Sequence, residues 1–326
     1  MTTVYIGIGL ARYSDWAFTS SVVVLVAALL LLAGELAYSH NRKAETHERV
    51  GAAGPTPRRN RTTVGAHAAA PGIVADSPKR PLHERVGNAG LALTYAGIGL
   101  LLACIVLRGL ATSRVPWGNM YEFINLTCFC GLVAAAVVLR RPQYRALWVF
   151  VLMPVLILLT VSGRWLYTNA APVMPALQSY WLPIHVSVVS LGSGVFLLAG
   201  VASILFLLKS YLPSNSLVQL LPDSQTLDRI AYRTTIFAFP VFGFGVIFGA
   251  IWAEEAWGRY WGWDPKETVS FIAWVAYAAY LHARSTAGWR DKKAAWINIV
   301  GFVAMVFNLF FINLAIAGLH SYAGVM

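Results

Sequence analysis

The feature that most constrains this chain is a series of apolar runs, each about 20 residues long. A helix rises about 1.5 Å per residue, so a run of this length crosses the roughly 30 Å hydrocarbon core of a bilayer. The runs are continuous and do not alternate between apolar and polar residues, which argues against a transmembrane β-barrel. Only 12% of the residues are charged, about half the share found in soluble domains. The sequence therefore predicts an all-α, polytopic integral membrane helical bundle.

We expect about eight transmembrane helices in this bundle. Their ranges are 17–38, 88–111, 120–139, 146–162, 185–208, 234–252, 268–284 and 294–317. The chain then divides into three parts. These are an N-terminal outward segment with the first transmembrane helix (1–38), a basic connector (39–86) and a membrane domain (87–326). The connector is rich in Ala, Gly, Pro and Arg, a composition that predicts a disordered cytoplasmic segment.

The distribution of lysine and arginine indicates which loops face the cytoplasm. Of the 25 lysines and arginines, 19 lie in four alternate segments, 39–86, 140–145, 209–233 and 284–293. Cytoplasmic loops of membrane proteins carry the excess of these residues, so both termini are expected to face outward. The net charge of +11 then follows mostly from topology. We expect no nucleic-acid partner.

One outward segment, 253–267, carries an unusual density of aromatic residues, in the stretch WGRYWGWDPKET. Trp257, Tyr260 and Trp261 have the i, i+3, i+4 spacing that aligns side chains on one helical face. Gly258 argues against a long regular helix, and it allows a backbone to approach a flat ligand closely. An aromatic belt at the bilayer interface would explain one or two tryptophans. The density here favours a surface that binds a planar aromatic ligand.

The end of this stretch has the pattern of a helix start. Asp264, Pro265 and Glu267 fit the N-cap, the first position and the third position of a helix. The capping role of the two carboxylates is better supported by the sequence than a catalytic role. A cap would also fix where the aromatic loop lies.

Three of the seven histidines lie in or against the predicted membrane region, where ionisable groups are rare and point to function. His185 and His320 are expected on the same outward side as the tryptophans. For either one alone, a hydrogen-bonded interface histidine is the simpler interpretation; together they suggest two axial ligands of an iron porphyrin. His282 ends the seventh span at the cytoplasmic side, roughly 27 Å away. It is either a residue at the lipid interface or a ligand at a separate, inner site.

These residues match a known family pattern. WGRYWGWDPKET resembles the WWD signature of the haem-handling superfamily, and LPIH before it and GLHSY after it resemble the family's histidine motifs. The segment YAAYLHAR is similar to the CcsA/ResC branch of System II cytochrome c biogenesis proteins, whose actinobacterial members are often labelled CcsB. The resemblance covers residue 88 to the end. It implies that the haem-binding residues are His185, His320, Trp257, Gly258, Trp261, Trp263, Asp264 and His282.

The resemblance also implies roles for these residues. His185 and His320 would be the axial iron ligands of an outer haem, and His282 would be a ligand of an inner haem. Apart from the resemblance, Arg259 is cationic and lies inside the loop, which suggests a contact with the haem propionates, although an arginine facing the interface fits the sequence equally well. No catalytic residue is expected apart from those that bind haem.

The implied function is that of a membrane subunit of the System II cytochrome c synthase in the plasma membrane, with the WWD loop on the extracytoplasmic side. It would bind haem b at its outer face, present it to the CxxCH motif of apocytochrome c for thioether attachment, and convey haem across the membrane. The implied partners are a ResB/Ccs1-type membrane protein, apocytochrome c, a thioredoxin-like thiol reductant and membrane lipid. Any enzymatic activity would belong to the holocytochrome c synthase (haem lyase) complex. Two alternatives stay open: a haem exporter without ligation activity, and a membrane b-type electron-transfer protein.

Overall fold

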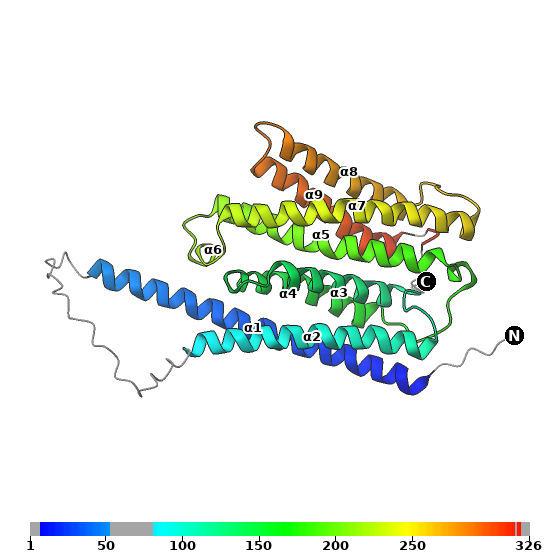
Figure 1. Ribbon diagram of the computed structural model, residues 1–326, viewed down its shortest axis with the longest axis horizontal. Helices are drawn as coiled ribbons and strands as arrows, with labels where there is room; N and C mark the ends of the chain where they lie inside the picture. The colour runs from blue at the N-terminus through cyan, green and yellow to red at the C-terminus, as the bar shows by residue number, and fades with distance from the viewer. Residues whose placement is uncertain (1–6, 53–80, 317, 321–326) are drawn as a thin grey trace, which may run out of the picture.

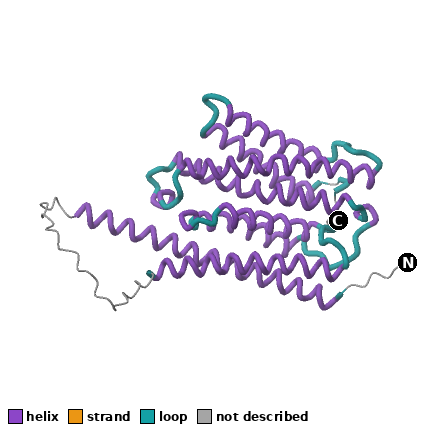
Figure 2. The backbone as a smooth tube through the Cα atoms, viewed as in Figure 1, coloured by secondary structure: helices purple, strands orange, loops and turns teal. Residues whose placement is uncertain are grey.

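The computed structural model describes residues 7–52, 81–316 and 318–320. Within these residues every regular element is a helix, as Figure 2 shows. The elements are α1 (Ile8–Ala52), α2 (Leu82–Thr112), α3 (Met120–Val138), α4 (Leu147–Trp165), α5 (Trp181–Tyr211), α6 (Ser216–Gln219), α7 (Ser224–Trp257), α8 (Pro265–Ser285) and α9 (Lys292–Ala315), with short 3-10 turns at Pro142–Tyr144 and Pro175–Leu177. Each of the eight predicted spans corresponds to one long helix. The all-α prediction is confirmed.

Seven of these helices, in the part of the chain that the structure describes, are long and apolar enough to cross a membrane. The exception is α8. Its 21 residues are enough to cross a membrane, but it is not apolar enough. It is more polar because Lys266 and Glu267 lie in its first turn and His282 and Arg284 in its last. The chain is a polytopic helical membrane protein, with seven such helices where the sequence suggested about eight.

Helix α5 occupies the centre of the bundle. Of its most apolar 18 residues, 83% are buried, against 22–61% for the other six membrane-spanning candidates. It packs against α7 and α9 on one side and α3 on the other. The antiparallel pair α1 and α2 forms one edge of the bundle, and the pair α8 and α9 forms the opposite edge, as Figure 1 shows. A long apolar run without a polar face, such as that of α5, is what a central helix requires.

The first helix is longer than its apolar run. It continues past the predicted end of the first span, through residues 39–52, which the sequence assigned to the disordered connector 39–86. Half of the residues of this extension are Ala, Glu, Arg or Lys, which are good helix formers. At the other end of the connector, α2 already begins at Leu82. Residues 53–80 of the connector lie outside the described residues.

The alternation of the helices brings the aromatic segments to one end of the bundle. The loops 113–119, 166–180 and 258–264 meet at the right of Figure 1, together with the start of α1 and the end of α9. The basic loop between α8 and α9 lies at the opposite end. The bundle therefore has an aromatic loop end and a basic loop end, as the charge distribution predicted.

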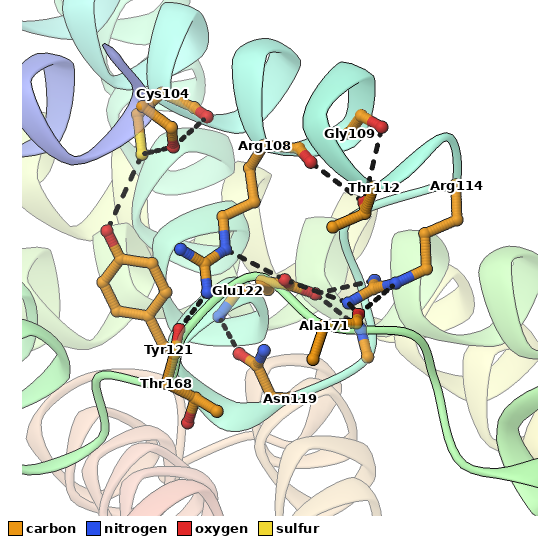
Figure 3. A network of polar contacts seen from close by, with 12 residues as sticks. Cys104, Arg108, Gly109, Thr112, Arg114, Asn119, Tyr121, Glu122, Thr168 and Ala171 are labelled. Carbon is orange, nitrogen blue, oxygen red and sulfur yellow. Dashed lines mark hydrogen bonds and ion pairs between the residues drawn. The ribbon is translucent and has the colours of Figure 1, made fainter. Parts of the chain in front are cut away.

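A buried ionic network ties the loop end together, as Figure 3 shows. Arg108 of α2 and Glu122 of α3 are only 1% and 3% exposed. The Arg108 Nε donates to Glu122 Oε1 at 3.1 Å, and the Arg114 Nη1 donates to Glu122 Oε2 at 3.0 Å. The Arg108 side chain also reaches Asp15 of α1 at 3.5 Å and donates to the carbonyl of Thr168. Two carboxylates, Glu122 and Asp15, and two guanidinium groups thus connect α1, α2, α3 and the 166–180 loop.

Replacing Glu122 with leucine should destabilise the protein strongly. Removing one partner of a buried ion pair typically costs about 3–5 kcal/mol, because the remaining charge stays buried without compensation. We expect a clear drop in the apparent unfolding temperature of the detergent-solubilised protein. The matched control is Glu254→Leu, since Glu254 is exposed and such surface changes typically stay within about 0.5 kcal/mol. Equal drops for both variants would contradict a structural role for the network.

Candidate functional site

A cavity opens at the aromatic loop end of the bundle, between α3, α5, α7, α8 and α9. It encloses about 1100 Å³ of empty space, part of which is open to solvent. Apolar side chains form most of its wall. Its titratable and polar lining residues include His185, Ser193, Lys266, Glu267, Ser270, Asn308 and His320. Both of the outward histidines identified in the sequence therefore face one apolar cavity.

His185 enters the cavity from the second turn of α5. Its Nδ1 lies 2.7 Å from the carbonyl oxygen of Gly245 in α7, and its ring lies parallel to that of Trp252, with ring centroids 6.0 Å apart. A Cβ atom at Gly249 would lie 2.6 Å from the ring atom Cε1 of His185. Gly249 therefore makes room for the imidazole, and Gly245, one helical turn earlier, supplies the carbonyl while its missing side chain lets Val189 of α5 approach α7.

This contact also fixes the protonation of the ring. A carbonyl oxygen only accepts hydrogen bonds, so Nδ1 of His185 must be the protonated nitrogen. The lone pair of a neutral imidazole is then on Nε2. A histidine oriented in this way, with one nitrogen donating to a fixed acceptor, has the arrangement common to metal-binding histidines.

His320 is held in the same manner by a different acceptor. Its Nδ1 lies 2.9 Å from Oδ2 of Asp264, and the backbone N–H of Leu319 donates to Oδ1 of the same carboxylate at 2.8 Å. Burial lowers the pKa of His320 below its ordinary value, even though the Asp264 carboxylate opposes that shift. Burial would raise the pKa of Asp264, but the hydrogen bonds from His320 and Leu319 lower it below its ordinary value. A neutral imidazole beside an ionised carboxylate is a good metal ligand.

Asp264 has a second role, as the N-cap of α8. It accepts a hydrogen bond from the backbone N–H of Lys266 at 3.3 Å, and Oε2 of Glu267 accepts from the N–H of Asp264 at 3.1 Å. The Asp264 side chain also accepts from the backbone N–H of Glu267, so the two residues form a reciprocal capping box, with Pro265 at the first helical position. The N-cap prediction is confirmed. The same carboxylate therefore starts α8 and orients His320.

The tryptophans do not share one helical face. Helix α7 ends at Trp257, and Gly258 adopts a left-handed conformation (φ 70°) that terminates it. The alignment expected from the i, i+3, i+4 spacing is therefore wrong. Trp257 packs edge-on against Trp252 and His320, with ring centroids 4.8 and 5.0 Å apart, and Trp261 lines the cavity.

Two other aromatic residues of the loop face outward. Tyr260 is 61% and Trp263 is 66% exposed. Trp263 also has a positive φ of 57°, which is unusual for a bulky residue. This conformation turns the chain sharply just before the cap at Asp264. The loop thus has an inner pair of tryptophans, Trp257 against His320 and Trp261 in the cavity wall, and an exposed outer pair, of which Tyr260 also lines the cavity.

Several residues of the site had not been identified from the sequence. Trp252 is buried and contacts both histidine rings, with centroids 6.0 Å from His185 and 5.8 Å from His320. A tryptophan at the end of a span is indistinguishable by sequence from an interface residue. Gly245 and Gly249 form a GxxxG pattern, which is a signal for close helix approach.

His282 lies away from this cavity. It is exposed near the C-terminal end of α8, at the basic loop end of the bundle. Because α2 begins earlier than its predicted span, His83 also lies inside a helix at that end. Helices α2 and α8 are at opposite edges of the bundle in Figure 1. His83 therefore does not provide a second ligand next to His282.

The protein groups at the cavity suit a metal that brings most of its own ligands. Among the described residues, no group of three or more His, Cys, Asp or Glu side chains is placed to hold a metal ion. The cavity instead offers two imidazoles, aromatic rings and an apolar wall. A planar metal macrocycle with two open axial positions matches this set of donors.

Comparison with known proteins identifies the family. The model of the family described as "Cytochrome C assembly protein" matches residues 117–320. The chain belongs to this family. The matched region contains the whole cavity, from the start of α3 to His320. A role in cytochrome c maturation follows from membership.

Curated relatives of the chain agree with this assignment. It is 35% identical to the cytochrome c biogenesis protein CcsA of Guillardia theta, over 70% of this chain and 85% of the relative. It is 31% identical to CcsA of Gloeobacter violaceus, over 74% of this chain and 87% of the relative. The prediction of a CcsA-type cytochrome c biogenesis protein is confirmed.

A solved structure shares the fold. The cytochrome c haem lyase CcmF superposes with a TM-score of 0.61 at 17% identity, over 92% of this chain. The chain covers 46% of the length of CcmF. The helical arrangement is therefore common to both proteins, at an identity too low to transfer residue roles.

Replacing Asp264 with alanine should release the segment that carries His320. The change removes both the cap of α8 and the acceptor of the Leu319 N–H and the His320 ring. We expect faster hydrogen exchange at the Leu319 amide, together with a loss of stability of about 1 kcal/mol or more from the cap. Asp223→Ala is the matched control, because Asp223 caps α7 but has no contact with the histidine segment among the hydrogen bonds described. Unchanged exchange at Leu319 in Asp264→Ala would show that this carboxylate does not hold the segment.

Proposed function

We propose that this chain is the membrane subunit of a System II cytochrome c synthase and that it binds haem b between His185 and His320. The observation that carries the proposal is the pairing of two oriented imidazoles on one apolar cavity. Each ring donates through Nδ1 to a fixed acceptor, Gly245 or Asp264, and so turns its other nitrogen into the ligand atom. Family membership makes haem the expected occupant.

The cavity residues suit the shape and chemistry of haem. The porphyrin supplies four nitrogens to the iron, and the two imidazoles supply the axial positions. Trp257, Trp261 and Trp252 provide flat apolar surface beside the histidines. The Gly258 turn ends α7 at this point and so leaves space for a ligand above its end. Trp263, Gly258 and Asp264 contribute by shaping the loop, and the last of them by holding His320.

The attachment of haem to apocytochrome c requires orientation more than acid–base catalysis. Each cysteine thiol of the CxxCH motif adds across one haem vinyl group, with its proton going to the adjacent vinyl carbon, so no other product forms. Holding two thiols against two vinyls can lower the barrier by several kcal/mol. In this chain, the two histidines fix the iron and the inner tryptophans fix the ring. Tyr260, which lines the cavity, and Trp263, which packs against Trp261, present exposed aromatic surface on which the apocytochrome would dock.

The reaction also needs reduced thiols, and the chain has little means to supply them. The three cysteines, Cys104, Cys128 and Cys130, are free and lie inside α2 and α3, two of them fully buried. We therefore assign the reduction of the apocytochrome cysteines to a separate thioredoxin-like protein. A ResB/Ccs1-type membrane protein would complete the synthase.

We assign His282 to a second haem site on the cytoplasmic side. Its exposed position at the basic loop end leaves the ring accessible to another membrane protein. A second axial ligand would then come from that partner, since the described part of α8 and its neighbours offers no other histidine there. Haem exchange between the two sites would convey haem across the membrane.

The two alternatives fit the structure less well. A b-type electron-transfer protein needs histidine pairs between its helices to carry electrons across the membrane, whereas the pair described here joins His185 of α5 to His320, which lies beyond the end of α9. A haem exporter without ligation activity would not need two oriented imidazoles beside an open aromatic mouth. The synthase explains both features.

The iron ligands can be tested by absorption spectroscopy of the purified complex with its membrane partner. We expect a Soret band with low-spin bis-histidine features in the wild type, and its loss or shift in His185→Ala/His320→Ala. The control is His83→Ala, which removes an imidazole at the other end of the bundle.

Each outcome has a distinct meaning. If the double variant binds haem with an unchanged spectrum, the iron ligands are His282 or residues of the partner, and not His185 and His320. A folded wild-type complex without haem would contradict the proposed function.

The proposed orientation places the cavity on the extracytoplasmic side of the plasma membrane. It follows from the excess of lysine and arginine at the other end of the bundle. Cysteines introduced at Tyr260, in the aromatic loop, and at Ala287, in the α8–α9 loop, distinguish the two sides. A membrane-impermeant maleimide should label only Tyr260→Cys in intact cells. Labelling of Ala287→Cys instead would invert the topology.

A further inference from the structure

A second hollow lies on the outside of the bundle, between α2 and α3 at the aromatic loop end. It encloses about 1120 Å³ of empty space, part of which is open to the surroundings. Its wall includes Leu102, Val106 and Leu110 of α2, whose side chains are 44–59% exposed. Because α2 is one of the membrane-spanning candidates, these side chains face the hydrocarbon of the bilayer. We call this hollow the α2–α3 groove.

The packing of α2 explains why this space exists. Helix α2 lies along α1 and contacts α3 at far fewer places. The one charged residue of the groove wall, Arg114, is engaged elsewhere, because it donates to both carboxylate oxygens of Glu122 and to the carbonyl of Ala171, as Figure 3 shows. Apart from Ser113 and the indole of Trp117, the rest of the wall is apolar. The groove therefore suits a ligand that is mainly apolar.

Trp117 separates the α2–α3 groove from the histidine cavity. Residues 113–116 line the groove, and residues 118–120 line the cavity that contains His185 and His320. Trp117 belongs to both walls. The chain therefore passes from one space to the other at this tryptophan, and its indole ring is the partition between a lipid-facing groove and the two imidazoles.

The backbone at Trp117 is held firmly, whereas its ring is not. The N–H of Trp117 donates to the carbonyl of Val115 at 2.9 Å, and the N–H of Gly118 donates to Oε2 of Glu122 at 2.7 Å. The indole Nε1 is buried and has no hydrogen-bond partner among the described residues, although a buried indole N–H usually finds one. Rotation of the ring would therefore break no described hydrogen bond and would leave the backbone in place.

We propose that haem passes sideways between the outer half of the bilayer and the histidine cavity, through the α2–α3 groove and past the ring of Trp117. The inference rests on the proposed function, since it takes haem as the ligand of the cavity. Haem is flat and mostly apolar, so it collects in a bilayer rather than in water. A side entrance would let haem load while the aromatic loop around Tyr260 stays available to the apocytochrome.

A route has a different effect on rates from that of a binding contact. Filling the groove should slow the entry and the exit of haem by the same factor and leave the affinity unchanged, because a route alters only the barrier between two end states. We expect exchange to become about tenfold slower, which corresponds to about 1.4 kcal/mol in the activation free energy. Removing the indole of Trp117 should make exchange faster.

The experiment follows the Soret band after haem is added to lipid vesicles that contain the full-length chain and its membrane partner, purified without haem. Val106→Trp and Leu102→Trp fill the groove at two positions, and Trp117→Ala removes the partition. The matched control is Val137→Trp, the same substitution at a side chain of α3 that is 65% exposed and lines neither space. We expect slow exchange in the two groove variants, the wild-type rate in the control and faster exchange in Trp117→Ala.

The outcomes separate this inference from the function on which it rests. Wild-type rates in both groove variants, or an equal slowing in Val137→Trp, would overturn the sideways route and leave the open mouth of the cavity as the entrance. Loss of the membrane partner from the groove variants would show that the groove seats the partner and not haem. A wild type that binds no haem at equilibrium would contradict the proposed function itself.

Discussion

The carboxylate of Asp264 is the interaction on which the rest of the site depends. It accepts hydrogen bonds from groups in two parts of the chain: the N–H of Lys266 at the start of α8, and the N–H of Leu319 and the ring of His320 beyond α9. A residue that merely capped a helix would be satisfied by the first of these. Because the other two come from beyond α9, one side chain sets the start of α8, the path of the chain after the last helix and the tautomer of an imidazole. These three features cannot vary independently.

The two histidines reach the cavity by different routes, and the difference has a physical basis. His185 is part of α5, the most buried helix, and its orientation is set by the α7 backbone at Gly245 and Gly249. Its position is therefore as rigid as the packing of two helices. His320 follows the last helix and relies on a side-chain carboxylate. The site combines one ligand fixed by the core with one fixed by a loop contact.

Much of this structure follows from local sequence rules, and the rest depends on contacts that no local rule contains. The helices were predictable because an apolar run long enough to cross a bilayer has few alternatives to a helix. The cap at Asp264 was predictable because Asp, Pro and Glu at these spacings satisfy the first N–H groups of a helix. Which tryptophans face inward was not predictable, because it depends on the end of α7 at Gly258. Trp252 and Lys266 resembled an interface aromatic and a helix-end charge, and only the packing of α3 and α5 around them shows that they line the cavity.

The buried network at Glu122 has a consequence for how the family's shared region relates to a folding unit. The match to the family begins at residue 117, yet both guanidinium groups that neutralise Glu122 belong to residues 108 and 114. The shared region alone would therefore carry a carboxylate without its counter-ions at the point where α3 begins. The helices α1 and α2 lie outside the family match, but they supply the charge that the matched part requires. In this protein the start of the family match and the boundary of electrostatic neutrality fall at different places, so the matched region by itself is not a neutral packing unit.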